Sequence, residues 1–252
     1  MKKNIRIIAR LDIKNQYLIK GINLEGLRKL GDPNEFATNY YKNGIDEILY
    51  LDNVASLYGK NTAYNIIERT IENTFIPIAV GGRIRTIGDV KKILNSGADK
   101  IALNSAAIKN PHIIKKISNE IGNQSLVISI ETKKIESEYY IFYNNGREVT
   151  NMKLVDWLAK IHKFGAGEIL VTCIDTDGTM KGFPVDLAKI LGKYCKLPLI
   201  LSGGFYDNKN LYEVLNNSKA DGIAIGSALH FKKTSILKIK KFLKSKKFEV
   251  RL

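Results

Sequence analysis

Residues 79–82 read AVGG and residues 97–108 read GADKIALNSAAI, and residues 201–204 (LSGG) and 219–230 (KADGIAIGSALH) repeat this pattern. Within it Gly81 and Gly82 match Gly203 and Gly204, and Asp99 matches Asp221, all at an offset of 122 residues. GIDEIL at residues 44–49 matches GAGEIL at residues 165–170 at an offset of 121 residues. Such nearly constant spacing predicts two half-folds of one architecture, about residues 1–122 and 123–252.

Short apolar runs rich in β-branched residues alternate with stretches of helical periodicity, including 89–96, 112–121 and 154–164. Alternating strands and helices predict a parallel sheet, and four units in each half predict a closed (β/α)8 TIM barrel. With 252 residues, the chain has the usual length for one such domain. The expected strands are Arg6–Asp12, Glu47–Asp52, Ile76–Val80, Lys100–Asn104, Leu126–Glu131, Glu168–Cys173, Leu197–Ser202 and Gly222–Gly226.

One segment interrupts the alternation of strands and helices. Residues 134–151 contain the run YYIFY followed by Asn144-Asn145-Gly146, a strong signal for a tight turn. We therefore expect a β-hairpin to be inserted after the fifth barrel strand.

Composition narrows the classes of function. The net charge of +15 would fit a nucleic-acid-binding protein, but many of the lysines lie in residues 232–252, where they predict a solvated helix face. No run of 18 uncharged apolar residues predicts a membrane span. The only cysteines, Cys173 and Cys195, lack metal-ligand spacing, and the three histidines are scattered. We therefore expect a cytoplasmic protein without a metal or redox cofactor, and without a nucleic-acid or membrane partner.

Two carboxylates end equivalent strands. Asp12 closes the first apolar run and Glu131 the run LVISIE, at an offset of 119 residues. Active sites of TIM barrels lie at the carboxyl ends of their strands. Two facing carboxylates there can serve as general acid and general base if their surroundings separate their pKa values. Either one could instead cap the loop that follows it.

Glycines and small polar residues end four other strands. Glycine allows backbone N–H groups to approach an anion closely. Two such sets across a barrel mouth predict a substrate with a phosphate at each end, and a polar loop after the sixth strand lies beside the second set. The loop is also compatible with an ordinary Asp-Gly turn. The sets comprise Gly81, Gly82, Asn104 and Ser105, and then Ser202, Gly203, Gly204, Gly226 and Ser227, with Asp177, Gly178 and Thr179 from the loop.

Charged residues begin four of the strands. Strand parity turns their side chains into the barrel at the end opposite the carboxylates. The four are Arg6, Glu47, Lys100 and Glu168. Two cations and two anions can neutralise one another, although burying them costs desolvation that an apolar plug would avoid. They are either a structural plug or a gate at the bottom of a channel.

Taken together, these motifs resemble the cyclase subunits of imidazole glycerol phosphate synthase (the HisF family) over essentially the whole chain. The matching segments include RIIARLDIKNQYLIKG, GDPNEF, GADKIALNSAA, GAGEILVTCIDTDGT and IAIGSALHF. The resemblance implies a glutaminase partner (HisH-like) at the barrel bottom and ammonia passing through the barrel to a bis-phosphorylated substrate. It makes Asp12 and Glu131 catalytic, Lys20 a substrate-loop lysine, the four inward charges an ammonia gate, and Asp99 a partner contact. The implied reaction converts phosphoribulosyl-formimino-AICAR-phosphate to imidazole glycerol phosphate and AICAR.

Three residues depart from the family pattern. Glu131 stands where the family usually has Asp, and its extra methylene changes the reach of the carboxylate. Arg10 stands where Cys is usual, and parity turns it inward, where it can pair with Asp12 or Glu131 and lower the pKa of either. Arg83 replaces the third glycine of the first phosphate motif, which strengthens anion binding or reshapes the loop.

These departures leave alternatives to the histidine-pathway cyclase. One is a catalytically altered paralog that docks a glutaminase and delivers ammonia to a separate sugar-modifying amidotransferase. Another is the sister sugar isomerase of the histidine pathway, which needs no glutaminase and would not require the inward charged ring. Nucleic-acid binding rests on net charge alone.

Overall fold

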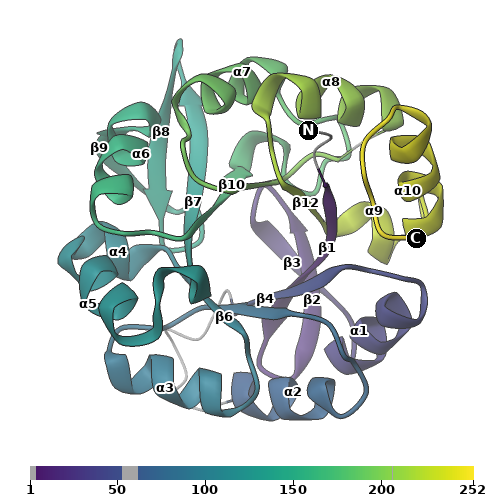
Figure 1. Cartoon of the computed structure of the whole chain (residues 1–252), viewed down its shortest axis with the longest axis horizontal. Helices are drawn as coiled ribbons and strands as arrows, with labels where there is room; N and C mark the ends of the chain where they lie inside the picture. Colours follow the sequence, from purple (N-terminus) through teal and green to yellow (C-terminus); the bar gives the residue numbers. More distant parts are fainter. Residues whose placement is uncertain (1–3, 53–61, 206) are drawn as a thin grey trace.

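The computed structural model describes residues 4–52, 62–205 and 207–252. Eight parallel strands form a closed barrel in the order β10-β11-β12-β1-β4-β5-β6-β7, and pairing of β10 with β7 completes the circle (Figure 1). The predicted (β/α)8 architecture is confirmed. The barrel strands are β1 Arg6–Lys14, β4 Glu47–Asp52, β5 Ile78–Gly81, β6 Lys100–Leu103, β7 Leu126–Ile135, β10 Glu168–Cys173, β11 Leu199–Ser202 and β12 Gly222–Ile225.

Helices surround the barrel on its outside (Figure 1). They form where one apolar face can pack on the strands, as in α5, which buries Ile114 and Ile117. The helices are α1 Pro33–Lys42, α2 Thr62–Ile71, α3 Ile87–Asn95, α4 Ser105–Lys109, α5 His112–Ile121, α6 Leu154–Lys163, α7 Val185–Tyr194, α8 Asn208–Ser218, α9 Ser227–His230 and α10 Ile236–Ser245, with 3-10 turns η1 Asn123–Ser125 and η2 Ile174–Thr176.

The apolar core has two main layers. The larger one lies between strands and helices and includes Trp157, which is completely buried. The smaller one fills the middle of the barrel with one side chain from each parallel strand: Ile8, Leu49, Ala79, Ala102, Val127, Leu170, Ile200 and Ala224. This inner layer separates the two ends of the barrel, and both ends carry charged side chains.

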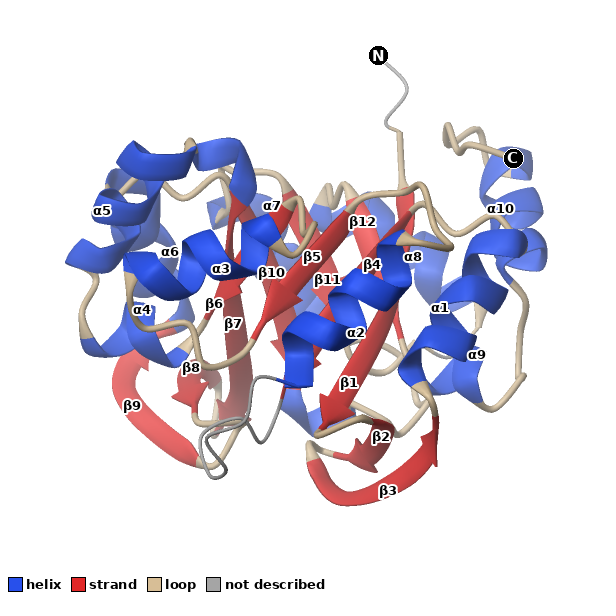
Figure 2. Cartoon of the chain, turned by 90° about the horizontal axis from the view of Figure 1, so that it is seen from below, coloured by secondary structure: helices blue, strands red, loops and turns tan. Residues whose placement is uncertain are grey.

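Two β-hairpins extend the barrel at its carboxyl end, away from both chain termini (Figure 2). The expected one is confirmed as β8 Glu138–Tyr143 and β9 Glu148–Lys153, with Asn144, Asn145 and Gly146 all at positive φ. The other, β2 Tyr17–Ile22 and β3 Glu25–Gly31, follows β1 just as β8 and β9 follow β7. The internal repeat therefore includes the hairpins. The sequence analysis missed the first hairpin because β3 is mostly exposed and shows no alternation of buried and exposed residues.

Aspartates at the opposite end join neighbouring strands. The Asp99 carboxylate accepts a hydrogen bond from the backbone N–H of Ile78 at 2.8 Å, and Asp221 accepts one from Leu199 at 2.8 Å. The repeated aspartate therefore fixes the start of a strand in each half. This gives Asp99 a role within the chain, and its contact with a partner stays a prediction.

The C-terminal helix α10 largely presents the expected solvated lysine face, with one exception. Lys240 is buried, and its Nζ donates to the carboxylate of Asp46 and the carbonyl of Gly44, both at 2.6 Å. Lys240 therefore anchors α10 to the start of β4.

Candidate functional site

The two candidate catalytic carboxylates lie at the carboxyl ends of β1 and β7, inside the region covered by the hairpins. Asp12 is almost completely buried, and its two oxygens each meet a cation. Arg10 Nε lies 2.9 Å from Asp12 Oδ1, and Lys20 Nζ lies 2.8 Å from Asp12 Oδ2. Burial opposes ionisation, but the two adjacent cations outweigh it and hold the pKa of Asp12 well below its usual range.

Glu131 has a different environment. Its Oε2 accepts a hydrogen bond of 2.7 Å from the backbone N–H of Gly146, in the turn of the β8–β9 hairpin. Burial is the main cause that raises the pKa of Glu131 to about 7, despite the opposing effects of this hydrogen bond and of Arg10. The surroundings thus separate the pKa values of the two carboxyls. Of the two partners predicted for Arg10, the structure selects Asp12.

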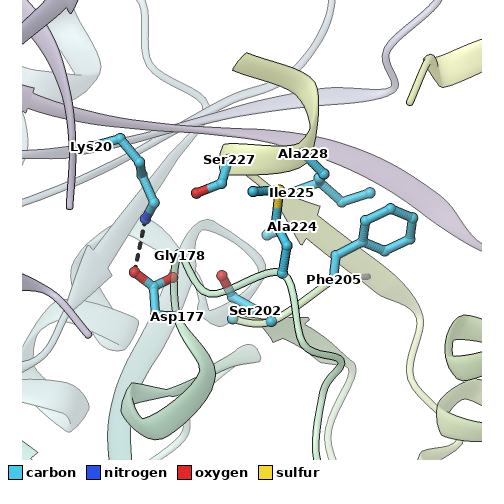
Figure 3. Close-up of a pocket in the computed structure, with 13 residues that line it drawn as sticks. Lys20, Asp177, Gly178, Ser202, Phe205, Ala224, Ile225, Ser227 and Ala228 are labelled. Carbon is cyan, nitrogen blue, oxygen red and sulfur yellow. Dashed lines mark hydrogen bonds and ion pairs between the residues drawn. The ribbon is translucent and has the colours of Figure 1, made fainter. Parts of the chain in front are cut away.

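Residues of the second predicted phosphate set line a small pocket at the ends of β11 and β12. Figure 3 shows Lys20, paired with Asp177, on one side of it, and Ser202 and Ser227 beside it. Gly178, Gly203, Gly204 and Gly226 also line the pocket. Thr179 does not, because its hydroxyl donates to the Thr176 carbonyl at 2.8 Å.

Ser227 has an unused hydroxyl in this pocket. Its Oγ is buried and has no hydrogen-bond partner among the described residues. A buried polar atom without a partner costs free energy, so a bound anion that accepts this hydrogen bond would remove the cost. Lys20 adds a cation. The residues of this pocket therefore fit a phosphate group.

The first predicted phosphate set is engaged with the β8–β9 hairpin. Asn144 N–H donates to Ser105 Oγ at 3.1 Å, and Asn104 Nδ2 donates to the carbonyl of Ser129 at 3.1 Å. A Cβ on Gly82 would come within 2.6 Å of the Asp52 carbonyl oxygen, so packing alone explains that glycine, and Gly81 is tightly enclosed as well. Phosphate binding by this set stays a prediction.

Arg83, at the position of the third glycine of the family motif, has a backbone conformation that glycine favours. Its φ is 51°, in the left-handed region. The side chain is exposed, so Arg83 adds a cation at the surface of the loop.

The four inward charges at the other end form a closed ring, here called the lower ring (Arg6, Glu47, Lys100 and Glu168). Arg6 pairs with Glu47 at 2.5 Å and with Glu168. Lys100 pairs with the same two carboxylates at 3.2 and 2.9 Å. Charges alternate around the ring, which confirms the predicted mutual neutralisation. Whether the ring controls passage of ammonia stays a prediction.

Three functional neighbours were missed by the sequence analysis. Thr172 accepts a hydrogen bond from Arg10 at 3.1 Å, and the inward parity of β10 could have indicated it. Gly146 supplies the hydrogen bond to Glu131 through its backbone, which no sequence pattern predicts. His230 is buried, and its Nδ1 lies 2.7 Å from the Tyr40 hydroxyl. Burial lowers the pKa of His230 to about 4, which keeps it neutral at neutral pH.

No group of three His, Cys, Asp or Glu side chains in residues 4–52, 62–205 and 207–252 is arranged to hold a metal ion. Within the same ranges, none of the helices has the length and apolar character needed to cross a bilayer.

Comparisons with known proteins agree with this geometry. The family model of the histidine biosynthesis proteins matches residues 6–235. An imidazole glycerol phosphate synthase subunit HisF from Legionella pneumophila is 52% identical over 202 residues, covering 80% of this chain and 95% of the relative. Subunits of the same name from Natranaerobius thermophilus and Clostridium botulinum are 40% and 42% identical, each over 98% of both chains.

None of these names supports the alternative of an altered paralog that serves a sugar-modifying enzyme. They also give no support to the sugar isomerase or to nucleic-acid binding. Identity of 40% over nearly full length is far above what a shared barrel fold alone requires. The chain belongs to the histidine biosynthesis family and, within it, to the HisF subunits of imidazole glycerol phosphate synthase.

Proposed function

We propose that the chain is the ammonia-using cyclase subunit that converts phosphoribulosyl-formimino-AICAR-phosphate to imidazole glycerol phosphate and AICAR. The observation that carries the proposal is that Asp12 and Glu131 lie at the carboxyl end of the barrel, opposite the lower ring, and that Lys20, which pairs with Asp12, also lines the pocket. The names of the relatives supply the reaction, and the residues of this chain supply a site that suits it.

The substrate carries two phosphates, and the barrel mouth offers two candidate positions for them. One phosphate is proposed to enter the pocket of Ser202, Gly203, Gly204 and Ser227, where Lys20 supplies a cation. The other is proposed to bind Gly81, Gly82, Asn104 and Ser105 after the β8–β9 hairpin releases the Ser105 hydroxyl. Anchoring both ends would hold the reacting centre between them, beside the carboxylates.

Proton transfer is assigned to the carboxylates. Ammonia must lose protons as it is incorporated and the imidazole ring closes. A general base works best with a pKa close to the working pH, and the pKa of Glu131 is raised to about 7. Asp12 contributes a fixed negative charge near the same centre. General acid–base catalysis of this kind contributes about 10²–10⁴-fold to rates.

Ammonia is proposed to arrive from a glutaminase subunit docked at the lower ring, with Asp99 in the contact surface. The eight-residue inner layer is apolar, so it favours neutral ammonia over ammonium. The lower ring would admit ammonia when its ion pairs rearrange. The two free cysteines suit a reducing compartment, and we place the protein in the cytoplasm.

The test uses purified protein with an ammonium salt and measures consumption of the substrate by its ultraviolet absorbance. We expect turnover that falls at least 100-fold in Glu131→Gln, as loss of a general base requires, and that also falls in Asp12→Asn, which removes the fixed negative charge. Asp156→Asn makes the same chemical change on the exposed face of α6 and should retain full activity. Absence of turnover by folded wild-type protein would refute the proposal.

The pH dependence provides a second test. A base must be ionised, so the rate should rise with pH through about 7 as Glu131 loses its proton. Total ammonium must be adjusted at each pH to keep the concentration of free ammonia constant. A rate independent of pH between 5.5 and 8.5 (about the stable range of most proteins) would contradict the role of Glu131.

A further inference from the structure

Arg10 occupies the barrel axis just above the apolar inner layer. Its side chain is almost completely buried and reaches across the barrel from β1. Nε donates to Asp12, and one terminal nitrogen donates to Thr172 Oγ1 on β10 at 3.1 Å and to Ser202 Oγ on β11 at 3.0 Å. Three neighbouring elements therefore fix the guanidinium in one orientation.

Arg10 also completes a second closed ring of charges, here called the upper ring (Arg10, Asp12, Lys20 and Asp177). Asp12 forms ion pairs with both Arg10 and Lys20. Asp177 also pairs with both cations, at 3.5 Å from Arg10 and 2.8 Å from Lys20. Each of the four side chains is at most 4% exposed. The barrel thus holds one alternating ring at each end of its apolar layer. The lower ring suits a partner face, whereas the upper ring contains a catalytic carboxylate.

Glu131 stands beside this ring without joining it. Its pKa responds to Arg10, Asp12 and Asp177, but its carboxylate accepts its hydrogen bond from the backbone N–H of Gly146. His230, which also faces Asp12 and Lys20, is uncharged near neutral pH because its pKa is lowered to about 4. Among the described residues, the two cations that pair with Asp12 are matched by two aspartates.

The consequences of adding one proton differ between the two carboxyls. A proton on Asp12 would leave two buried cations with one aspartate, which is costly in a low-dielectric interior. A proton on Glu131 removes a partly buried charge that forms no ion pair with the residues that the structure describes, and so relieves a desolvation cost. We propose that Arg10 is a positioning residue that keeps Asp12 as a permanent carboxylate, so that Glu131 alone carries the proton during the reaction. This inference rests on the proposed function, in which both carboxylates act at the substrate.

The test follows the protonation of both carboxyls directly, by ¹³C nuclear magnetic resonance of protein labelled at its side-chain carboxyl carbons. Asp12→Asn and Glu131→Gln assign the two resonances. In the wild type we expect the Glu131 resonance to titrate near pH 7, while the Asp12 resonance stays constant between about pH 4 and 9, since paired cations lower a carboxyl pKa by 1–3 units. Titration of Asp12 within this range in the wild type would overturn the inference without any variant.

Arg10→Gln removes the charge and retains an amide donor, and Arg10→Lys restores the charge. In Arg10→Gln the Asp12 titration should shift upward by about 1–3 pH units, which is the effect of one adjacent opposite charge. Arg10→Lys should return it towards the wild-type position. If Arg10 had only a structural role, the Asp12 titration would not return in Arg10→Lys merely because the positive charge is restored. An Asp12 resonance that is unchanged in folded Arg10→Gln would overturn the inference.

Kinetics separate this inference from the proposed function. The dependence of kcat on pH should show the Glu131 ionisation alone in the wild type and in Arg10→Lys, and a steeper fall at the acid end of the profile in Arg10→Gln. If the wild type does not consume the substrate, the proposed function fails, while the resonance titration still decides the role of Arg10. If the wild type is active and Asp12 titrates near neutrality, the inference about Arg10 fails alone.

Discussion

Replacing Lys100 by Met removes one cation from the lower ring with little change in length. Lys100 Nζ lies 3.2 Å from Glu47 and 2.9 Å from Glu168, whose side chains are only 2% and 8% exposed. The variant leaves two buried carboxylates with Arg6 as their cation. Breaking a buried ion pair by removing one partner costs about 3–5 kcal/mol of stability. Because the Lys100 side chain is 19% exposed, we expect the lower part of this range, about 3 kcal/mol.

The loss of stability in Lys100→Met should increase as the pH rises. Burial already raises the pKa of Glu47, and loss of Lys100 raises it further. A carboxyl whose pKa is higher in the folded than in the unfolded protein binds more protons when folded. Its effect on stability therefore becomes less favourable as pH rises through the folded pKa. We expect Lys100→Met to lower the free energy of unfolding less at pH 5 than at pH 8. The difference should be about 1 kcal/mol for each unit by which the pKa of Glu47 rises between these two pH values.

Urea unfolding at the two pH values measures both effects, with Lys91→Met as the matched control. Lys91 pairs with Glu120 at 2.6 Å on the surface, where the two side chains are 57% and 43% exposed. Its loss should change stability little at either pH, because water and salt screen an exposed ion pair. Equal costs for Lys100→Met and Lys91→Met, or a Lys100→Met cost that does not grow with pH, would refute the view of the lower ring as a buried, mutually neutralised cluster.

Three further substitutions test other parts of the account. Trp157→Ala should lower the free energy of unfolding by about 3–5 kcal/mol in urea titrations, because the completely buried indole leaves a cavity. Gly204→Ala should weaken binding of a phosphate-bearing ligand in calorimetry, because φ is +87° and the new Cβ would lie 2.4 Å from the Gly182 carbonyl oxygen. Gly88→Ala serves as the control, because its new Cβ would make only an ordinary contact, 3.5 Å from Thr86 Oγ1. Glu131→Gln should raise stability at pH 8 but not at pH 5, because it removes a buried carboxylate whose pKa is about 7, and equal stability at pH 8 would contradict that burial.

Much of the fold was predictable because the repeat and the strand parity are both local signals. β4 and β10 begin and end at the predicted residues, and the lower ring follows from parity alone. The β2–β3 hairpin was missed because its outer strand is polar on both faces and its turn lacks the Asn-Gly signal of the other hairpin. The repeat itself could have indicated it, since the hairpin occupies the position equivalent to β8–β9.

The site was predictable as a set of residues but not as a network. Sequence position placed Asp12 at a strand end and Asp177 in the loop after another strand, and the family resemblance placed Lys20 in the loop after the first strand. Their ion pairs, in contrast, depend on side-chain lengths and on the barrel radius. The separation of the two carboxyl pKa values depends on burial under the hairpins and on a backbone N–H of Gly146, and neither is visible in a motif. The unused hydroxyl of Ser227 likewise appears only once its neighbours are placed.

The central claim is that ammonia entering at the lower ring reacts at the carboxylate end without leaving the barrel. The direct measurement uses the complex of this chain with a glutaminase subunit, glutamine labelled with ¹⁵N in its side-chain amide, the bis-phosphorylated substrate and an excess of unlabelled ammonium in solution. The account predicts that imidazole glycerol phosphate carries the ¹⁵N label nearly undiluted, and that Glu131→Gln stops its formation. A label diluted to the isotopic composition of the bulk ammonium would contradict the internal route, and absence of this product would contradict the proposed reaction.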